Sequence, residues 1–91
     1  MSRVVWTAQA MADLREIRQF IARDSRMYAQ RTIKRIRAAV HSCRRFPDAA
    51  PMAPEFDDPE IRETFVGSYR ALFRLTPKTI TVLTVVHAAR R

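Results

Sequence analysis

Apolar residues recur at helical spacing near the start of the chain. Leu14, Ile17 and Ile21 lie three and four positions apart, which is the period of one helix face. Thr7 precedes them and offers a hydroxyl that can cap a helix. We therefore predict a first helix from about Ala8 to Arg23.

A second helical pattern follows almost at once. Its apolar positions again recur by threes and fours, at Ala29, Ile33, Ile36, Val40 and Cys43. Ser25 can cap its start and Phe46-Pro47 ends it, so the pattern predicts a helix from about Arg26 to Arg45. Because the connection between the two helices is short, they are expected to pack antiparallel as a helical hairpin.

The remaining regular segments have the composition of strands. A short one, Arg3–Trp6, precedes the helices, and three more follow them at Ile61–Val66, Tyr69–Leu75 and Thr79–Val86. Gly67-Ser68 and Thr76-Pro77-Lys78 read as the turns between the last three, which makes an antiparallel meander. The prediction is one α+β domain over residues 1–91, ordered β-α-α-β-β-β, with an antiparallel sheet packed against the helical hairpin.

A proline-rich loop, PDAAPMAPEFDDP, separates the helices from the late strands and shows no periodic pattern. We expect its Met52 and Phe56 to pack against the core.

Side chains of a strand alternate between its two faces. In Tyr69–Leu75 this places Tyr69 and Phe73 under the helices and turns Arg70 and Arg74 toward solvent or a partner. Replacing both arginines with alanine is then expected to cost little stability.

Charge is distributed unevenly along a chain whose formal net charge is +8. Residues 15–45 contain ten Lys and Arg but two acids, whereas residues 48–63 contain six acids and one base. Such an excess favours nucleic acid, the ribosome or an acidic protein as partner. A plain nucleic-acid-binding module is an alternative, although the sequence has no stacking-aromatic signature, Gly-rich clamp or helix-turn-helix pattern.

Other classes of protein fit the composition poorly. No apolar run approaches the ~20 residues of a membrane span, and the first residues lack the long apolar segment of a signal peptide, so we expect a cytoplasmic protein without membrane contact. The single cysteine, Cys43, cannot form an internal disulfide and reads as a small buried apolar residue. His41 reads as a surface histidine, and neither a metal nor a cofactor is expected.

Several short motifs, taken in order, resemble the ParE/RelE superfamily of bacterial toxins. They are a strand ending in Trp6, Ala12-Asp13-Leu14 followed by Ile17, the IARDS hinge, DPEIRE, VGSYRALFR and a closing H-x-x-R that starts at His87. The resemblance implies the toxin of a type II toxin–antitoxin module. It also implies a cognate antitoxin whose C-terminal segment wraps the toxin in a hetero-oligomer.

The superfamily contains two activities. Toxins of the RelE branch cut mRNA on the ribosome without metal, which requires proton-transfer groups and cations, and here Arg70, Arg74 and His87 are the candidates. A second proton-transfer residue is missing, because alternation turns Tyr69 inward and Tyr28 reads as a packing residue. If the protein is an enzyme, it is a metal-independent endoribonuclease of this kind.

The ParE branch is the better match, through its long paired helices and terminal H-x-x-R. Its toxins poison DNA gyrase rather than catalyse a reaction, which would make His87 a surface contact. The resemblance and the charge together suggest one surface for target and antitoxin, formed by Arg62, Arg70, Arg74, His87, Arg90 and Arg91.

Overall fold

The computed structural model describes residues 2–88, so Arg90 and Arg91 of the expected surface lie outside the described residues. Strand β1 (Arg3–Trp6) leads into helices α1 (Ala8–Ala22) and α2 (Arg26–Ser42). After a short 3-10 turn, η1 (Pro47–Ala49), come strands β2 (Ile61–Val66), β3 (Tyr69–Leu75) and β4 (Thr79–His87). This confirms the predicted order of helices and strands and the α+β class.

The two helices begin where the capping residues place them. The Thr7 hydroxyl accepts from the backbone N–H of Ala10 at 3.1 Å, and the Ser25 hydroxyl accepts from that of Tyr28 at 3.1 Å. Helix α2 ends earlier than expected, because the N–H groups of residues 43–45 bond three positions back and form tight turns.

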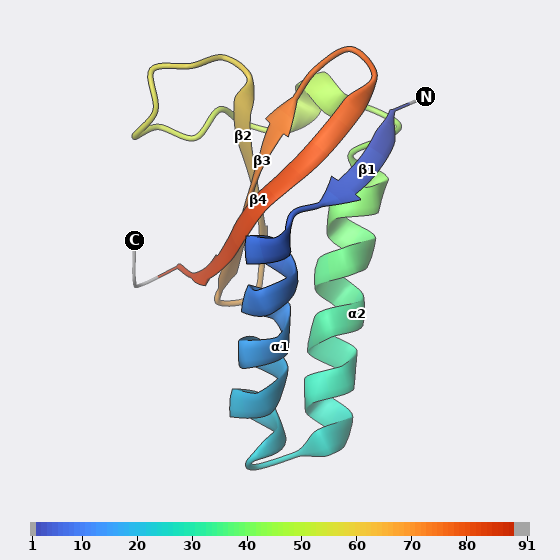
Figure 1. The fold of residues 1–91 in the computed structure, drawn as a ribbon, viewed down its shortest axis with the longest axis vertical. Coiled ribbons are helices and arrows are strands. Elements are labelled where there is room, and N and C mark those ends of the chain that lie inside the picture. Colours follow the sequence, from blue (N-terminus) through green and yellow to red (C-terminus); the bar gives the residue numbers. More distant parts are fainter. Residues whose placement is uncertain (1, 89–91) are drawn as a thin grey trace.

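The sheet order is β1-β4-β3-β2. Strands β2, β3 and β4 form the expected antiparallel meander, and Gly67 adopts φ +56° in its first turn, a conformation that favours glycine. Strand β1, however, pairs with β4 in parallel, from Arg3 opposite Thr79 to Trp6 opposite Val82. The sheet is therefore mixed rather than wholly antiparallel (Figure 1).

The helices cover one face of this sheet (Figure 1). The main core lies between them and includes the buried residues Leu14, Ile36, Val40, Phe73, Ile80 and Val82. Phe73 is fully buried there, as the alternation of β3 predicts. Half-buried Cys43 packs against this core, and burial raises the pKa of its thiol.

The other face of the sheet is covered by the loop between η1 and β2. Its fully buried Ala53 packs with Ile61 and Leu72. The expectation for Met52 and Phe56 is wrong, since both side chains are exposed. Alanine occupies the core position because the loop backbone runs close beside β2, with the Ala53 N–H bonded to the Ile61 carbonyl at 3.0 Å.

Candidate functional site

The loop-covered face of the sheet is built around Arg70. Its Nε donates to Glu63 at 2.6 Å, and its two terminal nitrogens donate to the two oxygens of Glu55, each at 2.6 Å. The two hydrogen bonds to Glu55, and then the one to Glu63, raise the pKa of Arg70. The expected exposure of Arg70 is wrong: the alternation holds, but the loop closes over the residue and leaves it 3% exposed.

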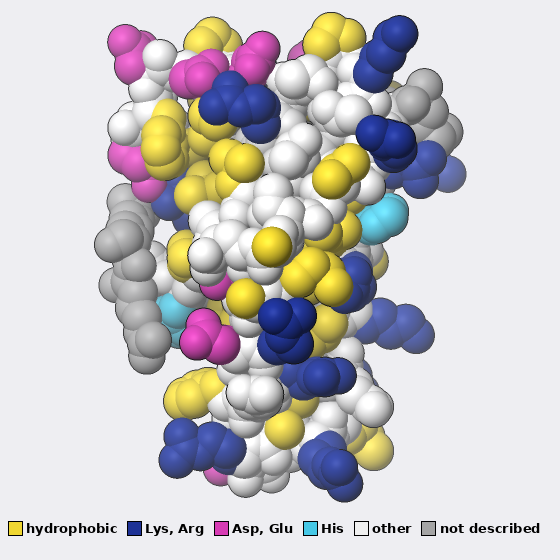
Figure 2. All heavy atoms as spheres, in the orientation of Figure 1, with side chains coloured by type: hydrophobic (Ala, Val, Ile, Leu, Met, Phe, Trp, Pro, Cys, Tyr) yellow, Lys and Arg dark blue, Asp and Glu magenta, His cyan; other side chains and the backbone are white. Residues whose placement is uncertain are grey.

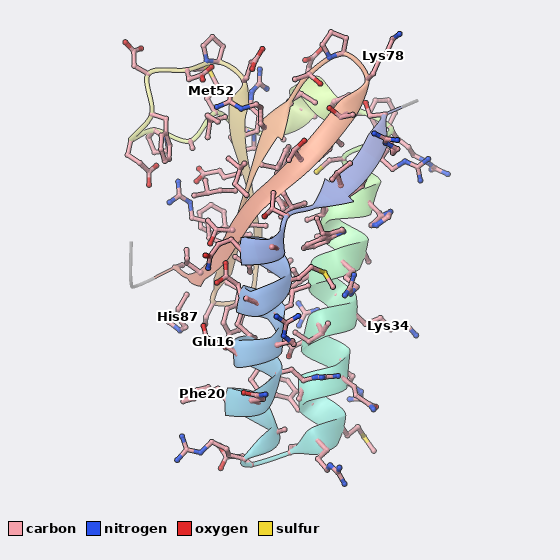
Figure 3. All side chains as sticks on the ribbon, viewed as in Figure 1. Glu16, Phe20, Lys34, Met52, Lys78 and His87 are labelled. Carbon is pink, nitrogen blue, oxygen red and sulfur yellow. The ribbon has the colours of Figure 1, made fainter. Side chains whose placement is uncertain are left out.

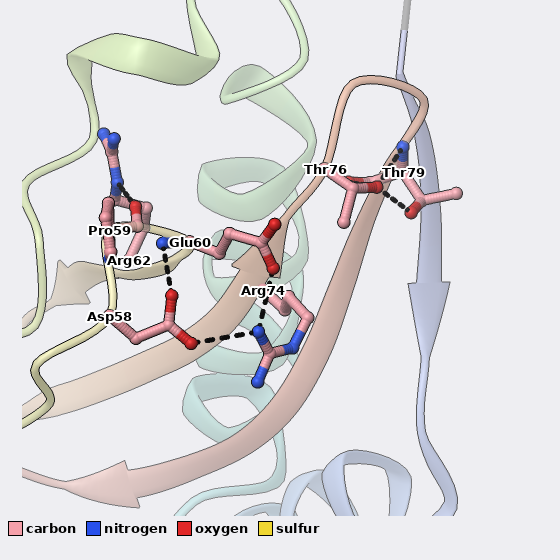
Figure 4. Close-up of polar contacts among 7 residues, drawn as sticks. All are labelled: Asp58, Pro59, Glu60, Arg62, Arg74, Thr76 and Thr79. Atoms are coloured by element: carbon pink, nitrogen blue, oxygen red, sulfur yellow. Dashed lines mark hydrogen bonds and ion pairs between the residues drawn. The ribbon is translucent and has the colours of Figure 1, made fainter.

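Arg74 lies further along β3 at the edge of the same loop. One terminal nitrogen donates to Asp58 at 3.1 Å and to Glu60 at 2.9 Å (Figure 4). The Glu60 backbone N–H, followed by the Arg74 guanidinium, lowers the pKa of Asp58. Arg74 remains 43% exposed, so it is the more accessible of the two arginines.

Arg62 is engaged by backbone carbonyls. Its Nε donates to Pro59 at 2.7 Å (Figure 4), and Nη1 donates to Ala50 at 2.8 Å. The three arginines of the expected surface that lie within the described residues thus bind the acidic segment of their own chain. Carboxylates balance the charge of Arg70 and Arg74, whereas Arg62 donates to neutral carbonyls.

His87 lies on the opposite face of the sheet. It pairs with Tyr69 across β3 and β4, and the two rings meet edge to face, 5.5 Å between centroids and 81° between planes. Arg70 follows Tyr69 along β3 and therefore points to the other side. The structure does not bring Arg70 and Arg74 together with His87.

A groove opens between α1 and the end of β4. It has a volume of about 580 Å³, and its lining includes Glu16, Ile17, Phe20, Arg23, Tyr69 and His87. Figure 3 shows Glu16, Phe20 and His87 on one side of the molecule. Phe20 is 60% exposed although it is aromatic.

A second hollow adjoins the first, between the helical hairpin and the turn that joins β2 to β3. It has a volume of about 310 Å³, shares Phe20, Tyr69 and His87 with the groove, and adds Tyr28 and Arg35 to the lining. Tyr28 is exposed, so the expectation that it packs in the core is wrong. Together the two hollows, here called the aromatic groove, offer partly apolar walls with charged residues among them.

Asp13 is a buried acid whose role the sequence reasoning missed. It accepts hydrogen bonds from Gln9 Nε2 at 2.8 Å, from the Val85 N–H at 3.0 Å and from the Thr84 hydroxyl. Strand β1 stops at Trp6, opposite Val82, so the next part of the β4 edge lacks a strand partner and Asp13 takes that place. An acid inside the apolar stripe of α1, beside Leu14, was the available signal.

Residues 2–88 contain no cluster of three or more His, Cys, Asp or Glu side chains that could hold a metal ion. Neither helix of this part of the chain has the length and apolar character needed to cross a bilayer. His41 is exposed, as expected.

Comparisons with known proteins agree with one another. The family described as ParE toxin of type II toxin-antitoxin system, parDE, matches residues 4–91. Toxin RelE2 of Caulobacter vibrioides is 32% identical over 91 residues, which cover 99% of each chain. A solved structure of the chromosomal ParDE TA system from P. aeruginosa has a similar fold, with a TM-score of 0.77, 22% identity and 96% of each chain covered.

Proposed function

Because this chain belongs to the ParE toxin family of type II toxin–antitoxin systems, we propose that it arrests growth by poisoning DNA gyrase and is neutralised by its antitoxin. Gyrase acts in the cytoplasm, so the proposal places the toxin there. Poisoning requires a surface that docks on the target and stabilises one of its states. It does not require reacting groups on the toxin.

The separation of Arg70 and Arg74 from His87 is the observation that carries this choice. Cleavage of RNA would need cations beside the developing phosphorane charge and proton-transfer groups within hydrogen-bonding reach. Arg70 is buried against Glu55 and Glu63 on one face of the sheet, while His87 points to the other. Arg70, Arg74 and His87, the residues that the sequence offers for a ribonuclease site, therefore do not face a common site.

One observation favours the ribonuclease alternative. Glu16, Arg23, Tyr69 and His87 all line the aromatic groove, and they include residue types that can transfer protons or stabilise anions. The relative from Caulobacter vibrioides also carries the name RelE2. Of these four side chains, Tyr69 and His87 meet edge to face, with 5.5 Å between their ring centroids.

We assign antitoxin binding to the aromatic groove. Phe20 presents an exposed aromatic ring at the junction of its two hollows, which suits an apolar anchor of a partner chain. Arg23 and Arg35 at the walls suit acidic residues beside that anchor. The resulting complex is a toxin–antitoxin hetero-oligomer, as the ParDE system from P. aeruginosa suggests.

The target is tested with purified components. Toxin is incubated with gyrase, ATP and supercoiled plasmid, and the reaction is stopped with detergent and protease, which releases trapped breaks as linear DNA. We expect linear plasmid that requires both toxin and gyrase. In a parallel reaction, programmed ribosomes should retain intact mRNA. Cut mRNA without linear plasmid would support the ribonuclease instead.

A further inference from the structure

Helix α2 carries a strongly basic outer face. No Asp or Glu occurs between Arg26 and Ser42, while the exposed side chains include Arg26, Arg31, Lys34, Arg35, Arg37 and His41. We call these six residues the basic face of α2. In Figure 2 dark blue side chains follow the α2 side of the molecule, and Figure 3 shows Lys34 projecting away from the sheet.

Helix stability does not account for this face. Arg31, Lys34 and Arg35 are three and four positions apart, so like charges are neighbours on the helix surface and repel one another. Arg26 occupies the first position of α2, where the positive end of the helix dipole disfavours a cation. Each of these placements opposes folding of the free protein.

The arginines of the sheet and those of α2 differ in their partners. Arg70 and Arg74 form ion pairs with the chain's own carboxylates. Within residues 2–88, Arg31, Lys34 and Arg35 have no carboxylate at ion-pair distance, and Arg37 stacks on Trp6 at 5.3 Å. The α2 cations therefore keep their charge available for an external polyanion.

We propose that the basic face of α2 binds the phosphate backbone of duplex DNA without reading its sequence. Seventeen helical residues span roughly 25 Å, and duplex DNA presents closely spaced phosphates along such a length. None of the six residues of the face is Phe, Tyr or Trp, whereas single-stranded nucleic acid is usually held by stacking on such rings. A protein partner would need an apolar interface core. Between these cations the exposed apolar side chains are the small Ala38 and the isolated Met27, which is 65% exposed, and Gln30 is polar.

The inference goes beyond the proposed target and does not depend on it. Lys34 points to the opposite side of the molecule from Glu16, Phe20 and His87 (Figure 3). Arg35 belongs to both surfaces, but the other five residues of the basic face do not line the groove, so DNA bound to them would leave the groove open to a protein. Such a toxin can contact DNA and a protein bound to that DNA at the same time.

The test measures DNA binding without gyrase. Fluorescence anisotropy with a labelled duplex of ~20 base pairs gives the affinity of the full chain between about 50 and 200 mM salt. The test variant is Arg31→Gln/Lys34→Gln. The control is Arg15→Gln/Arg18→Gln on α1, which has the same spacing, also changes two exposed residues and leaves the same net charge.

We expect the α2 variant to lose about tenfold or more in affinity, and the slope of log affinity against log salt to fall by about 2. The α1 control should lose no more than about twofold. The charge-conserving variant Arg31→Lys/Lys34→Arg should keep wild-type binding, and none of the three variants should melt below the wild type, since removing like charges from α2 relieves repulsion.

Three results would overturn the inference. Equal losses in the α1 and α2 variants would show a general effect of net charge. Tighter binding of a single strand of the same length would exclude preference for the duplex. Displacement of the duplex by polyglutamate at matched charge concentration would assign the face to an acidic polypeptide. Because gyrase is absent, none of these results bears on whether gyrase is the target.

Discussion

Arg70 and Glu55 form a two-point ion pair, with each terminal nitrogen of the guanidinium 2.6 Å from one carboxylate oxygen. The pair joins the central strand β3 to a loop residue fifteen positions earlier in the chain. Since Arg70 also binds Glu63, one buried cation links β2, β3 and the loop.

Replacing Arg70 with alanine should therefore destabilise the protein, contrary to the expectation from the sequence alone. It leaves the nearly buried Glu63 carboxylate without its partner, and losing one member of a buried pair costs about 3–5 kcal/mol. We expect a loss at the lower limit of this range, because the Glu55 side chain is 40% exposed and can be solvated by water when Arg70 is absent. Urea unfolding measures the loss, and Arg74→Ala, at the exposed pair, should lose less. Equal losses in the two variants would contradict this account.

Among the polar residues of α1, Asp13 should cause the largest loss of folding stability when it is replaced by alanine. Asp13→Ala removes the acceptor for the Val85 N–H, and an unsatisfied buried donor costs about 1–3 kcal/mol. Asp13→Asn retains one side-chain oxygen and should lose less. Glu16→Ala, one turn away and exposed, is the control and should unfold at nearly the wild-type urea concentration. A wild-type midpoint for Asp13→Ala would contradict the role assigned to this carboxylate.

Stability should fall in acid partly through Asp58. The pKa of this carboxyl lies below its ordinary 3.8 in the folded state, first through the Glu60 N–H and then through Arg74. A lowered folded pKa adds stability that is present above the unfolded value and is lost as the pH falls through the folded one. Asp58→Asn should therefore lose less stability than wild type as the pH falls below about 4.

The measurement for Asp58 is the urea midpoint as a function of pH. Asp57→Asn, the exposed neighbour, should keep the wild-type dependence. If Asp58→Asn and wild type respond alike to acid, the Asp58 contacts do not contribute to folding.

Phe20 should matter for neutralisation by the antitoxin rather than for folding. Its ring is 60% exposed at the junction of the aromatic groove, so Phe20→Ala should leave the melting temperature nearly unchanged. If the ring receives an apolar anchor, truncation should weaken antitoxin binding by roughly 30-fold, corresponding to about 2 kcal/mol. Phe46→Ala, which removes a 74% exposed ring outside the groove, is the matched control. Calorimetric titration with the antitoxin distinguishes the two, and unaltered affinity in Phe20→Ala would place the antitoxin elsewhere.

Local patterns were sufficient to predict the helices and strands. Helix α1 is indicated by the spacing of Leu14, Ile17 and Ile21, and both helices by their capping residues Thr7 and Ser25. These signals do not depend on the rest of the fold. Alternation likewise separates Phe73 from Arg70 on β3. These signals lie within a few residues of the positions that they describe, which is why they can be read without a structure.

The site depended on contacts between distant segments. Nothing near Arg70 indicates that Glu55 will cover it, and nothing near Arg3 indicates that it will pair with Thr79. The aromatic groove likewise exists only after Phe20 and His87 are brought together by packing of α1 on β4. The count of charged residues predicted a basic surface. It could not distinguish the arginines that form ion pairs within the chain, Arg70 and Arg74, from those that are exposed on α2.

The parallel pairing of β1 with β4 ties the appearance of the toxin to the order of synthesis. Arg3 pairs with Thr79, so more than seventy further residues must be synthesised before the partner strand of β1 leaves the ribosome. Until then α1 lacks the β4 edge that Asp13 and Thr7 bind, and one wall of the aromatic groove is absent. A nascent chain interrupted before Thr79 would therefore be unable to form that groove.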